Sequence, residues 1–252
     1  MITLVACNRP EAVYPPFDGS SKLTEVQHVY RDDQNPDLIL RQVIFSIYYN
    51  SQGKVSECFE GDRLLYRCTY DGNLLTQVET DFYSESPATV FDITYSDDRV
   101  NSVTYTFESN FSITMYYKYV SENEFTRFDT TGIEGDIVYN MVHFTEEKVE
   151  SVQINPFNTY SFTENFTYTK IPSFVSVFGF PTLPMYQVYL PLGLTAIPSE
   201  ILQIADYLPS EKEGDNGIHE TYEYEFSDGL VRKIYINSLI TGQKYEVVLI
   251  WN

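Results

Sequence analysis

The chain has 252 residues, and its 36 Asp and Glu residues outnumber its 16 Lys and Arg residues, which gives a formal net charge of −20. Such a surface repels nucleic-acid phosphates and anionic lipid headgroups, so we exclude nucleic acid and a bare membrane surface as partners. The 22 Tyr and 17 Phe residues favour half-buried pleated sheets and argue against a disordered chain.

The chain begins with a short motif that ends in a cysteine, Leu4-Val5-Ala6-Cys7. This motif resembles the lipobox of bacterial lipoproteins, in which cleavage leaves a lipidated cysteine at the new terminus. Only six residues precede Cys7, fewer than a signal peptide needs for its charged and apolar regions. Either the chain starts inside a longer signal peptide, or the match is accidental. The first interpretation makes residues 1–7 a signal remnant and Cys7 the lipidation site.

Residues 8–22 are rich in Pro and Ser and lack hydrophobic periodicity. This composition suits a tether between an anchored cysteine and a folded body, or an ordinary disordered terminus. We expect the remaining residues, 23–252, to form a single antiparallel β domain.

Strict alternation of apolar and polar residues is clearest in the middle of the chain, over residues 91–96, 103–108 and 111–119. This period of two is typical of antiparallel strands with one buried face. The polar turns between such segments are too short to connect anything but antiparallel neighbours.

One pattern recurs along the chain: a strand that ends in an aromatic residue, an acidic turn and a short apolar run. The anchor aromatics lie 21, 25, 24 and 25 residues apart and are Tyr49, Tyr70, Tyr95, Tyr119 and Phe144. Such a period indicates a series of similar units, here β-hairpins. The acidic residues of these turns are interpreted as turn formers and solubilising charges; they are Asp71, Asp97, Asp98, Glu146, Glu147 and Asp228.

A single short helix is predicted at about 199–208, with Ser199 as its N-cap and Pro209 after its end. The apolar stretch before it, 174–198, contains four prolines and is therefore a poor spanning helix. We expect a long antiparallel meander of a dozen or more strands, curled or closed into a barrel-like sheet, with the helix at one mouth or side.

No motif for catalysis, metal binding or a cofactor is present. The three histidines, His28, His143 and His219, lack the convergent spacing of a zinc site. The i, i+2, i+4 spacing of Glu211, Glu213 and Asp215 is loosely that of a calcium loop, but the rest of that pattern is missing. We therefore assign no catalytic residue, no metal ligand and no cofactor, and the ligand stays unknown.

Cys58 and Cys68 are candidates for a disulfide in an oxidising compartment. With Gly61-Asp62 as a two-residue turn, Cys58 opposes Leu65 and Cys68 points to the other face. Only a bulge or a longer turn would bring the two sulfurs together. A disulfide and two buried free thiols both remain open.

The lipobox, the Pro-rich tether and hairpin turns such as Tyr70-Asp71-Gly72-Asn73-Leu74 and Phe226-Ser227-Asp228-Gly229-Leu230 resemble uncharacterised Bacteroidales-type surface lipoproteins with tandem YD-like repeats. The resemblance covers residues 40–252. It implies a porin-like antiparallel β fold, no assigned activity, and a place in the periplasm or at the cell surface, anchored to the outer membrane through Cys7.

Three functions follow as hypotheses. The leading one is an exported, lipid-anchored, non-enzymatic binding or scaffold protein whose membrane contact is made only through the lipid. The second is glycan capture by exposed Tyr rings and carboxylates, and another cell-surface protein is an equally open partner. The third is a hydrolase, which requires carboxylates that converge across a cleft.

Overall fold

The computed structural model describes residues 20–32, 34–35, 37–80, 89–97, 99–106, 112–129, 137–145, 149–154, 161–173, 207–238 and 244–252. These residues form sixteen strands. The strands are β1 (Leu23–Arg31), β2 (Ile39–Tyr49), β3 (Val55–Glu60), β4 (Arg63–Asp71), β5 (Leu74–Thr80), β6 (Thr89–Ser96), β7 (Arg99–Thr106), β8 (Ser112–Ser121), β9 (Glu124–Asp129), β10 (Ile137–Phe144), β11 (Val149–Ile154), β12 (Phe162–Pro172), β13 (Tyr207–Gly214), β14 (His219–Ser227), β15 (Leu230–Ser238) and β16 (Lys244–Trp251).

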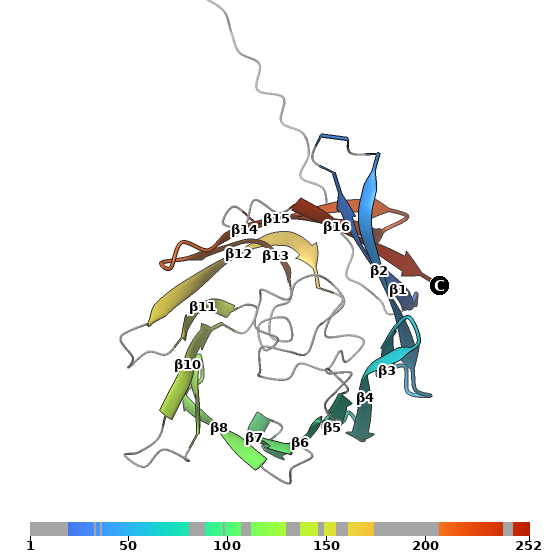
Figure 1. Cartoon of the computed structure of the whole chain (residues 1–252). Coiled ribbons are helices and arrows are strands. Elements are labelled where there is room, and N and C mark those ends of the chain that lie inside the picture. Colours follow the sequence, from blue (N-terminus) through green and yellow to red (C-terminus); the bar gives the residue numbers. More distant parts are fainter. Residues whose placement is uncertain are drawn as a thin grey trace, which may run out of the picture.

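Every strand pairs antiparallel with its neighbours in sequence, and β16 pairs with β1, so the meander closes into a barrel (Figure 1). At the closure Leu23 lies opposite Trp251. Just outside that pair, the backbones of Lys22 and Asn252 exchange two hydrogen bonds of 2.6 and 2.8 Å. The expectation of an all-β antiparallel meander curled or closed into a barrel is confirmed.

The predicted helix at 199–208 needs correction at its end. Residues 199–206 lie outside the described residues, but Tyr207 and Leu208 belong to β13. Pro209, expected to follow the helix, is the third residue of this strand. Strand β13 pairs with β12 on one side and β14 on the other. Residues 211–213 pair with both neighbours, and Tyr207 and Pro209 pair with β12, so the end of the predicted helix is strand.

Apolar side chains line the inside of the ring along nearly the whole meander. Registers link Val26 to Phe45, Val78 to Phe91 and Val142 to Val152, and all of these side chains are buried. No described element covers the outer face of the strands, so side chains buried in continuous rows must point inward (Figure 1). The buried apolar side chains therefore line the inside of the barrel rather than its outside.

The outer face is mostly polar and is held by side-chain hydrogen bonds between strands. Gln77 donates to Asp92 at 2.8 Å, the hydroxyls of Thr104 and Thr114 lie 3.0 Å apart, and Arg67 Nε donates to Glu57 at 2.8 Å. Each pair joins neighbouring strands.

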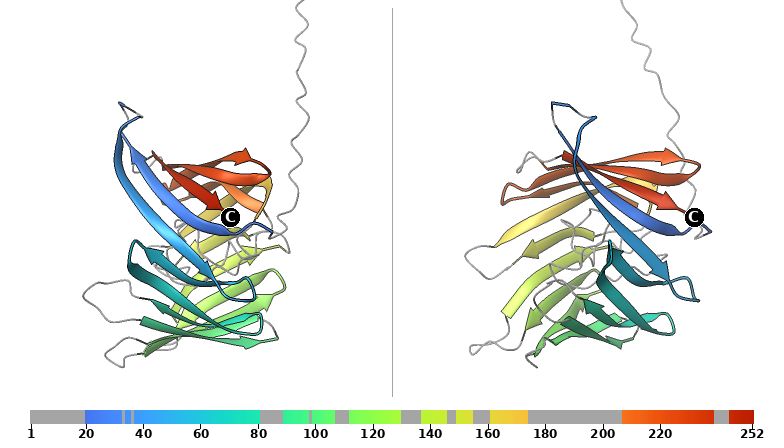
Figure 2. Two further views of the ribbon diagram at one scale, coloured as in Figure 1. Left: turned by 90° about the vertical axis from the view of Figure 1, so that its right-hand side faces the viewer. Right: turned by 45° about the vertical axis from the view of Figure 1, so that its right-hand side comes forward.

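The two ends of the barrel differ. We call the end where β1 begins and β16 ends the terminal rim, and the opposite end the distal rim. The β1–β2 hairpin projects beyond the other strands at the distal rim (Figure 2).

The repeating aromatics lie at the terminal rim. On six even-numbered strands the ring donates a hydrogen bond of 2.6–2.8 Å to a backbone carbonyl of the preceding strand. The donor and acceptor pairs are Tyr49–Leu23, Tyr70–Val55, Tyr95–Leu75, Tyr168–Val149, Tyr224–Pro209 and Trp251–Val231. These rings, with Tyr119 and Phe144 on β8 and β10, pack against the core. The repeat predicts that these anchors are mostly buried at equivalent strand positions; they are half-buried, because the rim leaves part of each ring in solvent.

Candidate functional site

Charged side chains interrupt the apolar inner wall on three adjacent strands. Lys212 on β13 places its Nζ 3.0 Å from Glu164 Oε1 on β12, and both side chains are almost fully buried, at 5% and 4% exposure. On β14 the Tyr222 hydroxyl donates to Glu220 Oε2 at 2.9 Å. We call these four residues the inner charged cluster.

Strand register explains how the cluster assembles. Lys212 lies directly opposite Glu220 on β14 and opposite Phe166 on β12. Glu164 lies two residues before Phe166, so both side chains point to the same face of β12, and Glu164 reaches Lys212 diagonally across the strand pair. One ammonium group thus lies between two carboxyl-bearing strands, near the distal rim.

The cluster is electrostatically costly. Burial raises the pKa of Glu164; Lys212 opposes this shift, and the nearby Glu220 adds to it. Burial and the neighbouring Glu220 also raise the pKa of Tyr222. Removing charges from water costs several kcal/mol per ion, which a well-placed partner only partly restores. Buried charges within an otherwise apolar lining are a common mark of a functional site.

Aromatic rings continue the inner wall beyond the cluster. The Tyr245 ring on β16 stacks on Tyr30 of β1, with centroids 5.2 Å apart, and lies 6.0 Å from the His28 ring. His28 also contacts Phe45, with centroids 4.9 Å apart. The inner wall near the distal rim therefore combines charges with stacked rings, whereas the rest of the described lining is mostly aliphatic and aromatic.

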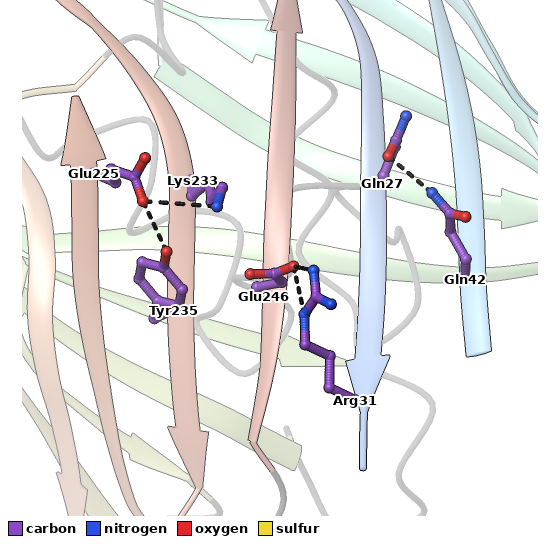
Figure 3. Close-up of polar contacts among 7 residues, drawn as sticks. All are labelled: Gln27, Arg31, Gln42, Glu225, Lys233, Tyr235 and Glu246. Atoms are coloured by element: carbon purple, nitrogen blue, oxygen red, sulfur yellow. Dashed lines mark hydrogen bonds and ion pairs between the residues drawn. The ribbon is translucent and has the colours of Figure 1, made fainter. Parts of the chain in front are cut away.

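The outer face near the barrel closure carries a second polar group of residues, which Figure 3 shows across β14, β15, β16, β1 and β2. The Tyr235 hydroxyl donates to Glu225 Oε2 at 2.7 Å, and Arg31 Nε donates to Glu246 Oε1 at 2.9 Å. On the next strands Gln42 Nε2 donates to Gln27 Oε1 at 2.8 Å. The Arg31–Glu246 pair joins the first strand to the last, so this group stabilises the closure.

The histidines are not brought together. His143 Nδ1 lies 3.0 Å from Glu124 Oε2, and His219 Nε2 lies 2.6 Å from Glu211 Oε1, on different parts of the barrel. Among the described residues no group of three His, Cys, Asp or Glu side chains could hold a metal ion. Of the suggested calcium ligands, Asp215 instead accepts the backbone N–H of Thr163 at 2.9 Å.

The cysteine register expected from the sequence is wrong. A bulge after Cys58 places it opposite Tyr66 rather than Leu65. Cys68, two residues beyond Tyr66, therefore shares the inner face with Cys58. Both cysteines are buried free thiols, and burial raises the pKa of each to about 12. A thiol with such a pKa is a poor nucleophile at neutral pH.

The acidic turn residues lie where the repeat predicts, as far as they are described. Asp71 ends β4 opposite Leu74, while Asp97 and Asp228 adopt left-handed backbone conformations with φ of 52° and 55°. Asp98, Glu146 and Glu147 lie outside the described residues, as does Cys7. The described turn aspartates belong to separate hairpins and form no common site.

The inner charged cluster was not identified from the sequence; near Lys212 only the calcium-like spacing of Glu211, Glu213 and Asp215 was considered. Simple alternation along β13 does not identify it, because the register shifts at Ser210, whose hydroxyl lies 3.0 Å from that of the exposed Thr167. Leu208 at the start of this strand is fully buried.

Comparison with known proteins supports the fold. No family model and no curated protein matches the chain. Among solved structures, the chain is similar to a porin-like protein from Bacteroides vulgatus ATCC 8482, with a TM-score of 0.51 and 11% identity over 91% of this chain and 98% of that one. It is also similar to a porin-like protein from Bacteroides uniformis ATCC 8492, with a TM-score of 0.51 and 17% identity over 96% of this chain and 99% of that one. At these identities the likeness shows a shared fold.

No helix among the described residues has the length and apolar character needed to cross a membrane.

Proposed function

We propose that the chain is an exported, lipid-anchored, non-enzymatic binding protein whose barrel stands in water at the outer membrane. The observation that carries this proposal is the orientation of the strand faces: the core is inside, and hydrogen-bonded polar side chains and ion pairs cover much of the outside. A membrane-spanning barrel has the opposite arrangement, with an apolar band facing lipid and a polar interior. In this proposal the porin-like barrel is therefore a folded domain in water rather than a transmembrane pore.

The inner wall near the distal rim is the proposed ligand-binding region. The inner charged cluster and the Tyr30–Tyr245 stack provide charge, hydrogen-bonding groups and ring faces on the two sides of β15. Binding sites commonly combine a mostly apolar lining with a few placed polar groups. A bound ligand would compensate for part of the cost of burying Lys212 and Glu164.

Membrane attachment is assigned to Cys7, in line with the resemblance to surface lipoproteins. The net charge of −20 keeps the body away from anionic headgroups, so a covalent lipid is needed for stable anchoring. The tether leads to Lys22 at the terminal rim, so this rim faces the anchoring membrane and the distal rim points away.

Metabolic labelling tests the anchor. The protein, expressed from its native upstream start in a Gram-negative host, is expected to incorporate a radioactive fatty acid, and Cys7→Ala is expected to abolish labelling. Cys58→Ala is the matched control, because that thiol is buried in the barrel and should carry no lipid. Labelling that survives Cys7→Ala would refute the anchor.

Glycan capture is the second candidate, and the exposed Tyr235 favours it. Its ring is 38% exposed on the outer face beside Glu225 and Lys233. Saccharide sites often combine ring stacking with polar groups. A glycan array probed with the wild type and with Tyr235→Ala tests this candidate, with Tyr48→Ala as a control for an exposed ring elsewhere. Binding that both variants retain would exclude Tyr235 as the platform.

A further inference from the structure

The β1–β2 hairpin carries a stretch of open sheet edge in a barrel that otherwise closes. Strand β2 pairs with β1 from Ile39 to Ser46 but with β3 only from Phe45 to Tyr49. Residues 39–44 therefore have a described strand on one side only. This stretch lies where the hairpin projects beyond the ring (Figure 2).

The backbone groups that face the open edge can be assigned. The Gly61 N–H donates to the Ile44 carbonyl at 3.3 Å, so the Ile44 backbone points toward the β3 side. In an antiparallel strand the backbone groups of alternate residues point to the same side. The N–H and C=O of Gln42 therefore face the open edge as well.

The side chains of the edge are apolar and exposed. Leu40 is 62% exposed, Ile39 46% and Ile44 41%. Natural proteins usually protect an edge with charges, proline, bulges or short strands. Within residues 38–44, the register shift at Leu40 is one such irregularity, but it leaves residues 41–44 regular, and Arg41 is the one charged residue in a chain with 36 acidic residues.

Arg41 gives the edge an electrostatic preference. Its guanidinium lies 5.7 Å from the centroid of the Tyr30 ring, and no carboxylate among the described residues pairs with it. Arg41 points to one face of β2 and Ile44 to the other, because side chains alternate along a strand. The register shift at Leu40 interrupts this alternation.

We propose that residues 39–44 of β2 bind an extended segment of a partner protein by strand addition. The segment would place apolar side chains beside Ile44 and a carboxylate on the opposite face beside Arg41. Main-chain hydrogen bonds supply affinity in this mode, and alternate side chains supply specificity.

Two other occupants fit less well. A second copy brings another net charge of −20, and antiparallel self-pairing centred on Arg41 opposes two guanidinium groups. An anionic membrane surface that approached the apolar residues of this edge would also approach the flanking Asp32 and Asp37 carboxylates, which it repels.

A peptide-display selection tests the proposal. A library of random twelve-residue peptides is panned against the purified Cys7→Ala chain, and enriched peptides are synthesised and titrated by fluorescence anisotropy. Enriched sequences are expected to alternate apolar residues around an acidic one. Panning against Arg41→Glu is expected to replace the acidic residue with a basic one.

A proline substitution at the edge distinguishes strand addition from nonspecific hydrophobic binding. Gln42→Pro removes the N–H that faces the open edge and leaves the hydrogen bonds to β1, a placement that edge strands tolerate. It is expected to weaken peptide binding by about tenfold or more, the loss expected from a main-chain hydrogen bond and a distorted edge. Gln42→Ala keeps the N–H and is the matched control, with little change expected. Circular dichroism checks that both variants stay folded.

Several results would overturn the proposal. One is the absence of enriched peptides; another is equal binding to Gln42→Pro and Gln42→Ala. A dimer in sedimentation analysis that Gln42→Pro dissociates would assign the edge to a second copy. Flotation with phosphatidylglycerol-containing vesicles that Leu40→Asp abolishes would assign it to a membrane.

Discussion

At the scale of single residues, the buried Lys212–Glu164 pair has the largest energetic consequence. Lys212→Met leaves Glu164 buried without its cation, which is expected to lower the free energy of unfolding by about 3–5 kcal/mol. The double variant Lys212→Met/Glu164→Gln is expected to recover much of this loss. Urea titration measures both. Arg67→Met is the control, because the exposed Arg67–Glu57 pair is worth about 1 kcal/mol or less.

The same pair predicts a pH dependence. Because burial raises the pKa of Glu164, its contribution to stability is complete below the ordinary glutamate pKa of about 4.3 and is lost as pH rises through the folded value. Lys212→Met should make this fall steeper, and Glu164→Gln should remove it. The three proteins are compared by urea titration from about pH 4, just below the ordinary glutamate pKa, to about pH 8, with the slope of stability against pH as the readout. Parallel slopes would contradict the assigned role of Glu164.

The rim aromatics give a second prediction at this scale. Tyr95→Phe removes the 2.8 Å hydrogen bond to the Leu75 carbonyl and is expected to cost about 0.5–1.5 kcal/mol. Tyr116→Phe is the matched control, since its ring stacks on Phe128 on the outer face and its hydroxyl makes no hydrogen bond among the described residues. Equal losses in the two variants would mean that the rim hydrogen bond contributes nothing specific.

Single residues were also where sequence reasoning was weakest. The regular spacing of aromatic residues predicted a series of equivalent strand positions, because residues with the same structural role in each hairpin tend to be of the same type. Long-range diagonal contacts leave no such trace: Glu164 and Lys212 lie 48 residues apart, and only the β12–β13 register joins them. The Cys58 bulge was likewise invisible, because one extra residue reverses every later face of a strand.

At the scale of elements, the hairpin turns follow local chemistry. The turn between Ser227 and Leu230 consists of Asp228 and Gly229, with φ of 55° and 76°, the left-handed pair that tight hairpins require. Gly229→Val is expected to cost about 1–3 kcal/mol, because a branched side chain is strained there. Asp228→Asn should change stability by about 0.5 kcal/mol or less. Thermal unfolding compares the two, and similar losses would refute the backbone argument.

The elements themselves were largely predictable where alternation was strict. Strands β6, β7 and β8 follow the expected segments because each has one apolar face and a short polar turn. Strand β13 was mistaken in part for the end of a helix, because Pro209 and Lys212 obscure its alternation. Its identity depends on pairing with β12 and β14, which local sequence does not encode.

At the scale of the whole molecule, closure depends on the last strand meeting the first. Trp251 lies opposite Leu23 and donates its indole N–H to the Val231 carbonyl at 2.7 Å. Trp251→Ala is expected to cost about 3–5 kcal/mol, and Trp251→Phe clearly less, since the ring is kept. Chemical unfolding followed by circular dichroism measures both. A loss below about 1 kcal/mol for Trp251→Ala would mean that the closure adds little to stability.

Closure was expected on general grounds, because a long antiparallel sheet with free edges is unstable toward association. The sequence predicted only in part which sheet face points inward. Uneven alternation of apolar and polar residues argued against an outer apolar band that faces lipid. That the apolar face lies inside follows from the pairing of all sixteen strands into a closed ring.

The central claim is that this barrel has its apolar core inside and stands in water. Sedimentation velocity of the purified Cys7→Ala chain in detergent-free buffer tests it most directly. The account predicts one compact, folded species whose sedimentation does not change when detergent is added. Aggregates that disperse only in detergent, as particles that carry bound detergent mass, would contradict it.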